Sequence, residues 1–362
     1  MKAALSEKLL SELGLPADVL ETVIKDLEVM ARYKYDHYEM FAPGMRFLEH
    51  LYSWLKQFSE EDRRPAVEFI RKHLIFISQR EMQDLARFLY YDLIVPELLR
   101  VIIEREGLRP FDYGKAFTQH FPHYLRRCLF IGLSDGAKID FFRRHHIQLS
   151  QDQVLPYYRT VGEDYLAQLR KDTGDQRATF FALFLIDDFT ASGYTLLREE
   201  SDADGSGVRQ TGTLQRLAEI HAARVKDVER IYLCHYVATH NAHAHVMRLA
   251  AKMDAYRGRL KCMAALLLSP EIAILPDTTK HDPLLSRVVA ISERYYSPKF
   301  EDQNTARAGG IRFGFGNQGL PVVLYSNTPN NSLYVLWLDT TVTPREEQFR
   351  ALFRRIPRHR PI

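Results

Sequence analysis

Four apolar runs in the middle of the chain constrain the fold most strongly. They are rich in β-branched and aromatic residues, and each is followed by polar residues and a stretch with helical spacing. The runs comprise residues 128–134, 178–188, 229–239 and 260–269. Continuous apolar runs of this kind are typical of parallel strands that helices cover on both faces. They predict an α/β fold with an open, mainly parallel sheet and right-handed crossovers.

The first hundred residues have a different texture, because their apolar residues recur at intervals of three and four. This spacing predicts amphipathic helices over most of the segment. Pro65 fits a first helical turn, and Pro96 is expected to kink or divide a helix. Two pairs have the spacing of capping boxes, Ser59 with Asp62 and Ser78 with Glu81.

The C-terminal third contains two further apolar runs, residues 319–328 and 331–339, joined by a turn-rich Thr-Pro-Asn-Asn segment. They predict a hairpin added to the edge of the fold. The polar stretch 201–212 is expected to be a mobile surface loop. The chain thus divides into an N-terminal helical region, residues 1–122, and an α/β domain, residues 123–362.

The composition excludes several classes of protein. With 362 residues, of which 46% are apolar and 26% charged, the chain is not a disordered, collagenous or disulfide-scaffold protein. A formal charge of only +3 gives no field that would gather nucleic acid. The three cysteines lack metal-ligand spacing and predict reduced thiols. The N-terminus has no signal-peptide core, and no apolar run approaches the 18 or so residues that span a bilayer, so we expect a cytoplasmic protein without a membrane partner.

The segment 184–195 carries the clearest chemistry, because an apolar strand ends there in Asp187 and Asp188. In open α/β sheets ligands bind beyond the carboxyl ends of strands. The small, hydroxyl-rich loop that follows is expected to open a helix, where its backbone N–H groups would bind an anion. Two adjacent carboxylates can accept from a vicinal diol or hold Mg²⁺ through its waters. This combination suits a ribose 5-phosphate, and the missing Gly-Lys-Ser/Thr ending argues against a nucleoside triphosphate loop.

The same run resembles the phosphoribosyl pyrophosphate motif of the type I phosphoribosyltransferases, with its apolar residues, two acids, and Thr/Ser-rich loop containing a glycine and a threonine. The resemblance implies a catalytic role for Asp187 and Asp188, which would address the ribose hydroxyls and the cofactor Mg²⁺. It also implies that a series of loop residues cradles the 5-phosphate. These are Thr190, Ala191, Ser192, Gly193, Tyr194 and Thr195.

A second loop follows the apolar run that begins at Cys128 and consists of Ser134, Asp135, Gly136 and Ala137. On its own it looks like an ordinary turn. In the resembled family, the loop after the first core strand binds pyrophosphate through backbone groups, and this loop occurs in the corresponding order. The resemblance therefore implies that residues 134–137 bind substrate.

Features near the C-terminus narrow the resemblance. Residues 313–316 and 326–332, Leu336 with Trp337, and the helical front half are similar to phosphoribosyltransferase-like proteins of bacterial conflict systems, over about residues 70–355. These occur near antiphage operons, including retron-type ones. The resemblance implies a nucleotide-binding glycosyltransferase of antiviral defence that acts at ribose C1 of phosphoribosyl pyrophosphate or a related nucleotide. An operon-encoded protein or a ribonucleoprotein is the implied partner, and a homo-oligomer stays open. The alternative is a non-catalytic regulator or adaptor.

The sequence departs from the purine-type members of the family, which carry a carboxylate where this chain has Ala191. A purine acceptor is therefore disfavoured. Orotate-type members use a basic mobile loop, for which several residues qualify, although solvated helix faces explain them equally well. The basic candidates are Arg143, Arg144, His145, His146, Arg159, Arg170 and Lys171. Four histidines, His235, His240, His243 and His245, suggest a metal site, but a polar loop with a helix start is the favoured interpretation.

Overall fold

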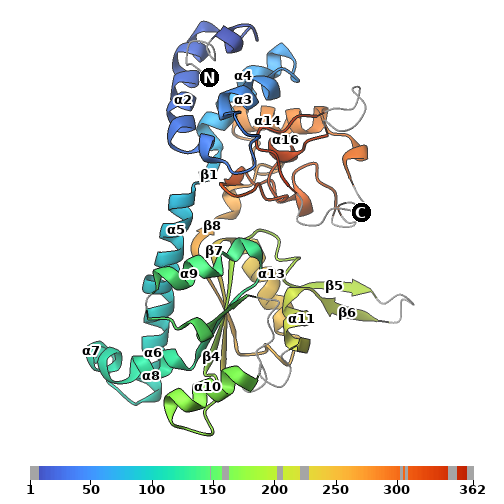
Figure 1. Cartoon of the computed structure of the whole chain (residues 1–362). Coiled ribbons are helices and arrows are strands. Elements are labelled where there is room, and N and C mark those ends of the chain that lie inside the picture. The colour runs from blue at the N-terminus through green and yellow to red at the C-terminus, as the bar shows by residue number, and fades with distance from the viewer. Residues whose placement is uncertain are drawn as a thin grey trace. The chain divides into compact units, whose positions relative to one another are not determined.

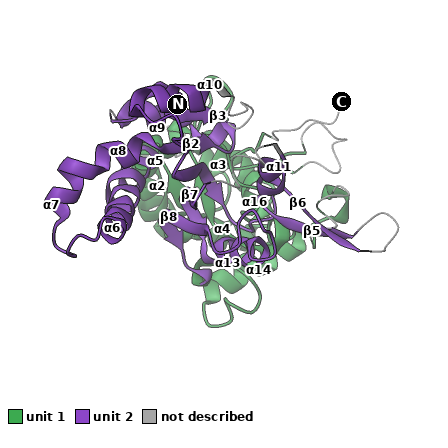
Figure 2. Cartoon of the chain, turned by 90° about the horizontal axis from the view of Figure 1, so that it is seen from below, with its two compact units in different colours: residues 1–81, 271–362 green, residues 82–270 purple. Residues whose placement is uncertain are grey.

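The computed structural model describes residues 8–146, 148–156, 163–201, 207–220, 228–301, 305, 309–340 and 349–356. The chain forms two compact units, which Figure 2 distinguishes by colour. Unit 1 contains residues 1–81 and 271–362, and unit 2 contains residues 82–270. This division differs from the boundary expected at residue 122.

Unit 2 is built on a five-stranded sheet in which all neighbouring strands are parallel. The strand order is β3-β2-β4-β7-β8. Its strands are β2 (Cys128–Gly132), β3 (Val154–Pro156), β4 (Ala182–Thr190), β7 (Arg230–Thr239) and β8 (Leu260–Leu268). Three of the four predicted runs contain one of these strands and the fourth, residues 178–188, contains most of β4, so the predicted fold class is confirmed. The short strand β3 was not predicted.

Helices cover the sheet of unit 2 on both faces (Figure 1). On one face, leucines and isoleucines of β2, β4 and β7 pack against α10 (Glu163–Thr173), α11 (Thr213–Ile220) and α13 (His240–Ala250). On the other face, Phe130, Phe184 and Tyr232 stack with ring centroids 4.9 and 4.7 Å apart. That stack is continued by Phe142 on α9 (Ile139–His145). The strands are therefore buried on both faces, which explains their continuous apolar runs.

The remaining elements of unit 2 surround this sheet. The Tyr232 hydroxyl donates to the buried Glu97 of α6, and Lys261 of β8 forms an ion pair with the same carboxylate at 2.9 Å. These contacts tie the helices before residue 122 to the sheet, which is why no unit boundary falls there. The helices that precede the sheet are η3 (Leu89–Ile94), α6 (Val95–Arg105), α7 (Tyr113–Lys115), η4 (Ala116–His120) and α8 (Phe121–Arg126). Two short helices, η5 (Asp135–Ala137) and η6 (Gln151–Gln153), lie between β2 and β3.

Unit 1 combines both ends of the chain. Its N-terminal elements are η1 (Val19–Val23), α2 (Ile24–Tyr33), η2 (Tyr35–His37), α3 (Phe47–Leu55), α4 (Glu60–His73) and β1 (Ile75–Ile77). Its C-terminal elements are α14 (Pro283–Arg294), η8 (Pro298–Phe300), η9 (Phe315–Asn317), β9 (Val322–Leu324) and α16 (Tyr334–Trp337). At its junctions with unit 2 lie α5 (Gln79–Phe88) and η7 (Pro270–Ile272).

The prediction of a C-terminal hairpin is wrong. The first of its two apolar runs forms β9, which pairs in parallel with β1 rather than with a neighbour in sequence. The second forms the short helix α16, whose four residues are all buried. A short apolar run that is buried on every side has no periodicity to separate strand from helix, and the structure resolves this ambiguity in favour of a helix.

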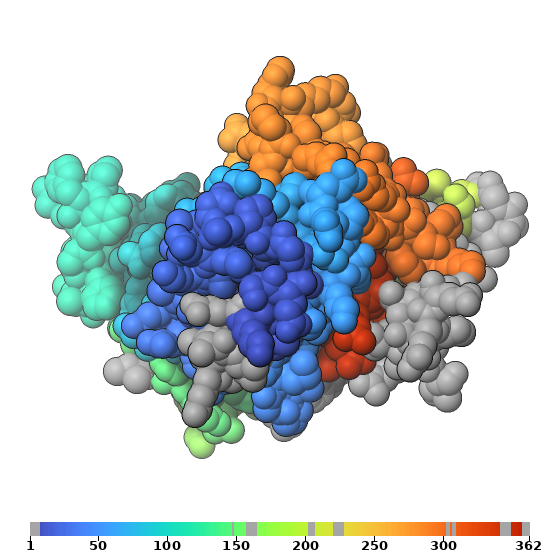
Figure 3. All heavy atoms as spheres, turned by 90° about the horizontal axis from the view of Figure 1, so that it is seen from above, coloured from blue at the N-terminus to red at the C-terminus, as the bar shows by residue number. Residues whose placement is uncertain are grey.

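Side chains from the two ends of the chain interlock in unit 1. The buried Asp62 of α4 accepts hydrogen bonds from Arg287 and Arg294 of α14 at 3.1 and 2.7 Å. In Figure 3 the blue N-terminal helices accordingly adjoin the orange segment that contains α14. Phe353, which is fully buried, packs among the rings of Phe47 and Phe76. Residues 271–362 therefore complete the N-terminal helical region instead of extending the sheet.

The predicted helix signals have mixed outcomes. Ser78 and Glu81 form the expected capping box at the start of α5. At the start of α4 the Ser59 hydroxyl bonds the Asp62 carboxylate instead of capping the helix. Pro65 lies inside α4 rather than in its first turn. The expected break at Pro96 takes the form of a π-helical segment, η3, immediately before α6.

Two expectations from composition can be compared with the structure. The three cysteines form no disulfide, and burial raises the pKa of each thiol, to about 12 for Cys262 and further for Cys128. Among the described helices, none is both long and apolar enough to cross a bilayer. Residues 202–206 of the predicted mobile loop lie outside the described residues, whereas its other parts contribute to the antiparallel strands β5 (Arg198–Ser201) and β6 (Val208–Thr211).

Candidate functional site

The two adjacent carboxylates, Asp187 and Asp188, lie at the carboxyl end of β4. Strand β4 pairs with β2 as far as Ile186, which lies opposite Gly132, so both acids follow the point where β2 ends. Asp187 is half-buried, and only 6% of Asp188 is exposed. Buried carboxylates require hydrogen-bond donors, and the loop that follows β2 provides the first of them.

This loop, residues 133–138, is called the Ser134 loop below. The Ser134 hydroxyl donates to Oδ1 of Asp187 and accepts a hydrogen bond from the Gly136 N–H at 3.1 Å. Leu133 N–H donates to the carbonyl of Ile186 at 2.8 Å, which holds the start of the loop beside β4. The loop that was predicted from its order in the sequence therefore contacts the predicted acids directly.

Gly136 touches the second acid. A Cβ atom built on Gly136 would lie 2.2 Å from Oδ2 of Asp188 and 2.6 Å from its Oδ1. The carboxylate therefore rests against the glycine backbone, where no other residue type leaves room. Oδ1 of Asp188 also accepts the N–H of Phe189 at 2.9 Å. These contacts define where the Asp188 carboxylate points.

The far end of the Ser134 loop is anchored to β7. The Tyr236 hydroxyl donates to the carbonyl of Ala137 at 2.8 Å. Lys138 then adopts a left-handed conformation, with φ of 46°, and α9 begins at the next residue. Asp135 is exposed, in contrast to the buried Ala137. The loop thus has a fixed side against the sheet and an exposed side.

The hydroxyl-rich residues Thr190–Thr195, called the hydroxyl loop below, follow the acids and pack against α13. Gly193 has a φ of +73°, and a Cβ there would lie 3.0 Å from the carbonyl oxygen of Ala242. The Thr239 hydroxyl, which caps α13, donates to the carbonyl of Ala191 at 2.5 Å. A glycine is therefore required where the loop turns close to the helix.

The helix expected directly after the hydroxyl loop is reduced to one turn, in which the N–H groups of Leu196 and Leu197 donate to the Gly193 carbonyl at 3.0 Å. The β5–β6 hairpin follows, and α11 begins only at Thr213. The N–H groups of Thr213 and Leu214 donate to the carbonyls of Thr195 and Leu196 at 3.0 Å. The hairpin is therefore an insertion that separates the first helical turn from the helix that stacks on it.

The hydroxyl loop presents only part of its surface to solvent. Thr190 and Ala191 are buried, Ser192 is half-buried, and Tyr194 and Thr195 are exposed. Tyr194 is 42% exposed, and its ring stacks on that of His245 with the ring centroids 5.2 Å apart. The accessible hydroxyls of this loop are thus those of Ser192, Tyr194 and Thr195. A ligand anion can reach these hydroxyls and the backbone between them.

The basic candidates are spread over several parts of unit 2. Arg170 and Lys171 lie in the last turn of α10, and the next residue, Asp172, pairs with Arg126 just before β2 begins. This position is at the amino edge of the sheet, opposite the acids. Arg143, Arg144 and His145 end α9, His146 is buried, and Arg159 lies outside the described residues.

The histidines near β7 do not assemble a metal centre. His235 is fully buried beside His243, with ring centroids 5.5 Å apart. Burial lowers the pKa of His235 to about 3 and that of His243 to about 4, so both imidazoles are neutral at pH 7. Within the described parts of the chain, no three His, Cys, Asp or Glu side chains are grouped so as to hold a metal ion. The favoured interpretation is correct in its helix start, because α13 begins at His240, and wrong in its polar loop, because β7 runs to Thr239 and contains the buried His235.

Sequence reasoning missed the supporting role of three residues, one of which, His245, it considered only as a metal ligand. Thr239 and Tyr236 of β7 fix the hydroxyl loop and the Ser134 loop, and His245 hydrogen-bonds the Leu197 carbonyl at 2.9 Å. Thr239 could have been found as an N-cap, since it directly precedes a helical stretch. The other two lie on elements whose pairing with these loops is visible only in three dimensions.

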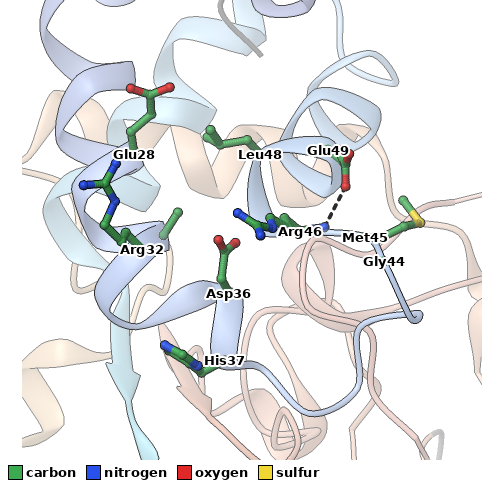
Figure 4. A pocket seen from close by; sticks show the side chains of 10 residues that line it. Glu28, Arg32, Asp36, His37, Gly44, Met45, Arg46, Leu48 and Glu49 are labelled. Atoms are coloured by element: carbon green, nitrogen blue, oxygen red, sulfur yellow. Dashed lines mark hydrogen bonds between the residues drawn. The ribbon is translucent and has the colours of Figure 1, made fainter. Parts of the chain in front are cut away.

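A separate pocket lies in unit 1, between α2 and α3 (Figure 4). It has a volume of about 660 Å³ and contains none of the predicted site residues. Its charged lining is mixed in sign, with the carboxylates of Glu28, Asp36 and Glu49 beside two arginines. Asp36 already accepts the first N–H of α3, from Phe47 at 2.9 Å. This pocket therefore has no excess of groups that bind anions.

Comparison with known proteins identifies the family of the chain. Neither the curated proteins nor the solved structures contain a match to the chain. A family model, PRTase-CE, matches residues 51–355, which include both loops and both acids. That match covers well over half of the 362 residues. The chain therefore belongs to the PRTase-CE family of phosphoribosyltransferase-like proteins.

Proposed function

We propose that the chain binds phosphoribosyl pyrophosphate, or a related nucleotide, with Mg²⁺ at the end of β4. One observation carries this proposal: the acids Asp187 and Asp188, the Ser134 loop and the hydroxyl loop meet at one edge of the sheet. Ligands of open α/β sheets bind at this edge. Membership of a phosphoribosyltransferase-like family supports the same ligand class.

The parts of the ligand correspond to the parts of the site. The ribose hydroxyls would donate to the carboxylates of Asp187 and Asp188. The 5-phosphate would accept from the N–H groups and hydroxyls of residues 190–195, as anions do in backbone nests. The pyrophosphate would lie at residues 134–137. These assignments are the ones that the resemblance to the type I phosphoribosyltransferases implies.

The donor set suits Mg²⁺. This ion prefers oxygen ligands, keeps several waters, and is commonly held by one or two carboxylates together with substrate phosphates. Asp187 and Asp188 provide two adjacent carboxylates. When bound, the ion would offset the charge of the pyrophosphate. The chain's own residues would hold the ribose and the phosphate in line.

The reaction that this geometry supports is substitution at ribose C1. The bond between C1 and the pyrophosphate oxygen breaks, pyrophosphate leaves with the electron pair, and a nucleophile forms the new bond to C1. Ala191 is buried and lacks the carboxylate that would act on a purine nitrogen, so a purine is a poor acceptor. The reaction is therefore transfer to another acceptor, or cleavage by water.

We further propose that the chain is a cytoplasmic effector of antiphage defence. The resemblance of its C-terminal segments to conflict-system proteins supports this role. The three unpaired thiols suit a reducing compartment. The role predicts that phage protection requires the same carboxylates as ligand binding, which a plaque assay with the variant described next would measure.

The first test is calorimetric titration of the native protein with phosphoribosyl pyrophosphate and Mg²⁺. The site variant is the double substitution Asp187→Asn and Asp188→Asn. A matched control changes the same charge at Asp254→Asn and Asp277→Asn, whose side chains are 95% and 91% exposed. We expect binding by the native protein and the control and no binding by the site variant. Equal binding by all three proteins, or by none, would contradict the proposal.

A second measurement separates the enzyme from the non-catalytic regulator. Incubation of the native protein with phosphoribosyl pyrophosphate and Mg²⁺ should release pyrophosphate, with or without an added acceptor. Binding without any release in the presence of cell extract would favour the regulator. The Asp187→Asn, Asp188→Asn variant provides the background rate.

A further inference from the structure

The contact between Ser134 and Asp187 has a consequence for ligand binding. Oδ1 of Asp187 accepts two hydrogen bonds, one from the Ser134 hydroxyl and one from the Asp188 N–H at 3.1 Å. A carboxylate oxygen has about two acceptor positions. Oδ1 of Asp187 is therefore already saturated by the protein itself.

We propose that the Ser134 hydroxyl is an internal competitor for the ligand at Oδ1 of Asp187, so that a ribose hydroxyl that reaches this oxygen must displace it. This inference rests on the proposed function and adds a regulatory step to it. A serine hydroxyl and a sugar hydroxyl are chemically equivalent donors to a carboxylate. Binding then exchanges one hydroxyl for another and gains less affinity than an unoccupied acceptor would give.

The second acid is covered by the same loop. Gly136 rests on the Asp188 carboxylate, and its N–H donates to the Ser134 hydroxyl. Displacing the Ser134 hydroxyl therefore loosens the contact that holds Gly136 over Asp188. Both acids become accessible in one movement of residues 134–136.

The two ends of the Ser134 loop allow this movement to be local. Ala137 is tied to Tyr236, and Leu133 is tied to Ile186. Residues 134–136 lie between these fixed points and are half-buried or exposed. The ends of the Ser134 loop thus stay fixed to the sheet, while its central residues 134–136 move away from the two carboxylates.

The two possible roles of Ser134, competition with the ligand and positioning of Asp187, predict opposite changes in the ligand affinity of the variant Ser134→Ala. If Ser134 competes, removing its hydroxyl tightens the binding of ribose 5-phosphate by roughly five- to tenfold, the worth of one net hydrogen bond. If Ser134 only positions Asp187 for the ligand, the same variant binds more weakly. The variant Ser134→Thr keeps a hydroxyl and should bind as the native protein does.

Inorganic phosphate is the matched ligand control, since it has no sugar hydroxyls that would compete with Ser134 for Asp187. Its affinity should be the same in the native protein and in Ser134→Ala. Ser150→Ala is the matched protein control, because Ser150 also donates its hydroxyl to a carboxylate, that of Asp152, outside the site. This control should leave both affinities unchanged.

The experiment is calorimetric titration of these four proteins with ribose 5-phosphate and with phosphate, in the presence of Mg²⁺. Hydrogen exchange without added ligand provides a second readout, in which the Gly136 amide should exchange faster in Ser134→Ala. Tighter ribose 5-phosphate binding by Ser134→Ala, with unchanged phosphate binding, supports the inference. Equal or weaker ribose 5-phosphate binding overturns the inference alone. Absence of ribose 5-phosphate binding in every protein overturns the proposed function and the inference together.

Discussion

The substitution Gly136→Ala tests the closest contact at the site. It adds one methyl group at a position where the added carbon would lie 2.2 Å from Oδ2 of Asp188. Ordinary van der Waals contact begins at about 3.4 Å. The carboxylate or the loop must therefore move by about 1.2 Å. Because Oδ1 of Asp188 also accepts from the Phe189 N–H, the carboxylate cannot rotate away without losing that hydrogen bond.

Two effects of different size follow from this displacement. Crowding a packed region commonly costs about 1–3 kcal/mol of folding free energy. Misplacing a functional group by about 1 Å can reduce rates by about 100-fold. We therefore expect Gly136→Ala to remain folded at 25 °C, and to weaken phosphoribosyl pyrophosphate binding or turnover by a factor between about 10 and 100.

The assay combines thermal unfolding with calorimetric titration, so that loss of folding and loss of binding are measured separately. Gly114→Ala is the matched control, because a Cβ at Gly114 would meet no atom within 4 Å. The control should bind as tightly as the native protein. A folded Gly136→Ala variant with native affinity would refute the assignment of Asp188 to the ligand site.

Three further predictions concern stability and the cofactor. Burial lowers the pKa of His146 to about 4 and that of His235 to about 3, so the unfolded chain binds more protons below its ordinary histidine pKa near 6.5. The free energy of unfolding should therefore fall as the pH falls below about 6.5, by about 2 kcal/mol for each imidazole at pH 5. Urea unfolding with hydrogen-exchange detection in unit 2 measures this change. An unfolding midpoint that is the same at pH 7 and pH 5 would contradict the prediction. Phe353→Ala should destabilise unit 1 by about 3–5 kcal/mol. The control Phe111→Ala, at a residue that is 74% exposed, should change the unfolding midpoint little. Equal effects of the two substitutions would contradict the burial of Phe353 in the core of unit 1. Chelation of Mg²⁺ with EDTA should weaken phosphoribosyl pyrophosphate binding at least tenfold in calorimetry, and unchanged binding would argue against a metal at the acids.

The sheet was predictable because its strands are buried on both faces, and strands of this kind consist of continuous apolar runs. Strand β3 was missed since its three residues end in a proline and carry little apolar signal. The extent of unit 1 was also missed, because β1 pairs with β9 across more than two hundred intervening residues. Local patterns contain no record of such a pairing.

The candidate site was predictable as a set of segments but not as a set of contacts. The acids, the Ser134 loop and the hydroxyl loop were named from their order along the chain. Their mutual contacts depend on strand register, which puts Ile186 opposite Gly132. The β5–β6 insertion interrupts the expected helix after one turn, and the first-turn residues 193–197 look the same in sequence with or without it.

The most direct test of the account is a crystal structure of the protein with phosphoribosyl pyrophosphate and Mg²⁺. We expect the ribose hydroxyls on the carboxylates of Asp187 and Asp188, and the 5-phosphate on residues 190–195. We also expect that the Ser134 hydroxyl no longer contacts Asp187. Ligand bound elsewhere, such as in the unit 1 pocket between α2 and α3, or bound with the Ser134 contact intact and the acids untouched, would contradict it.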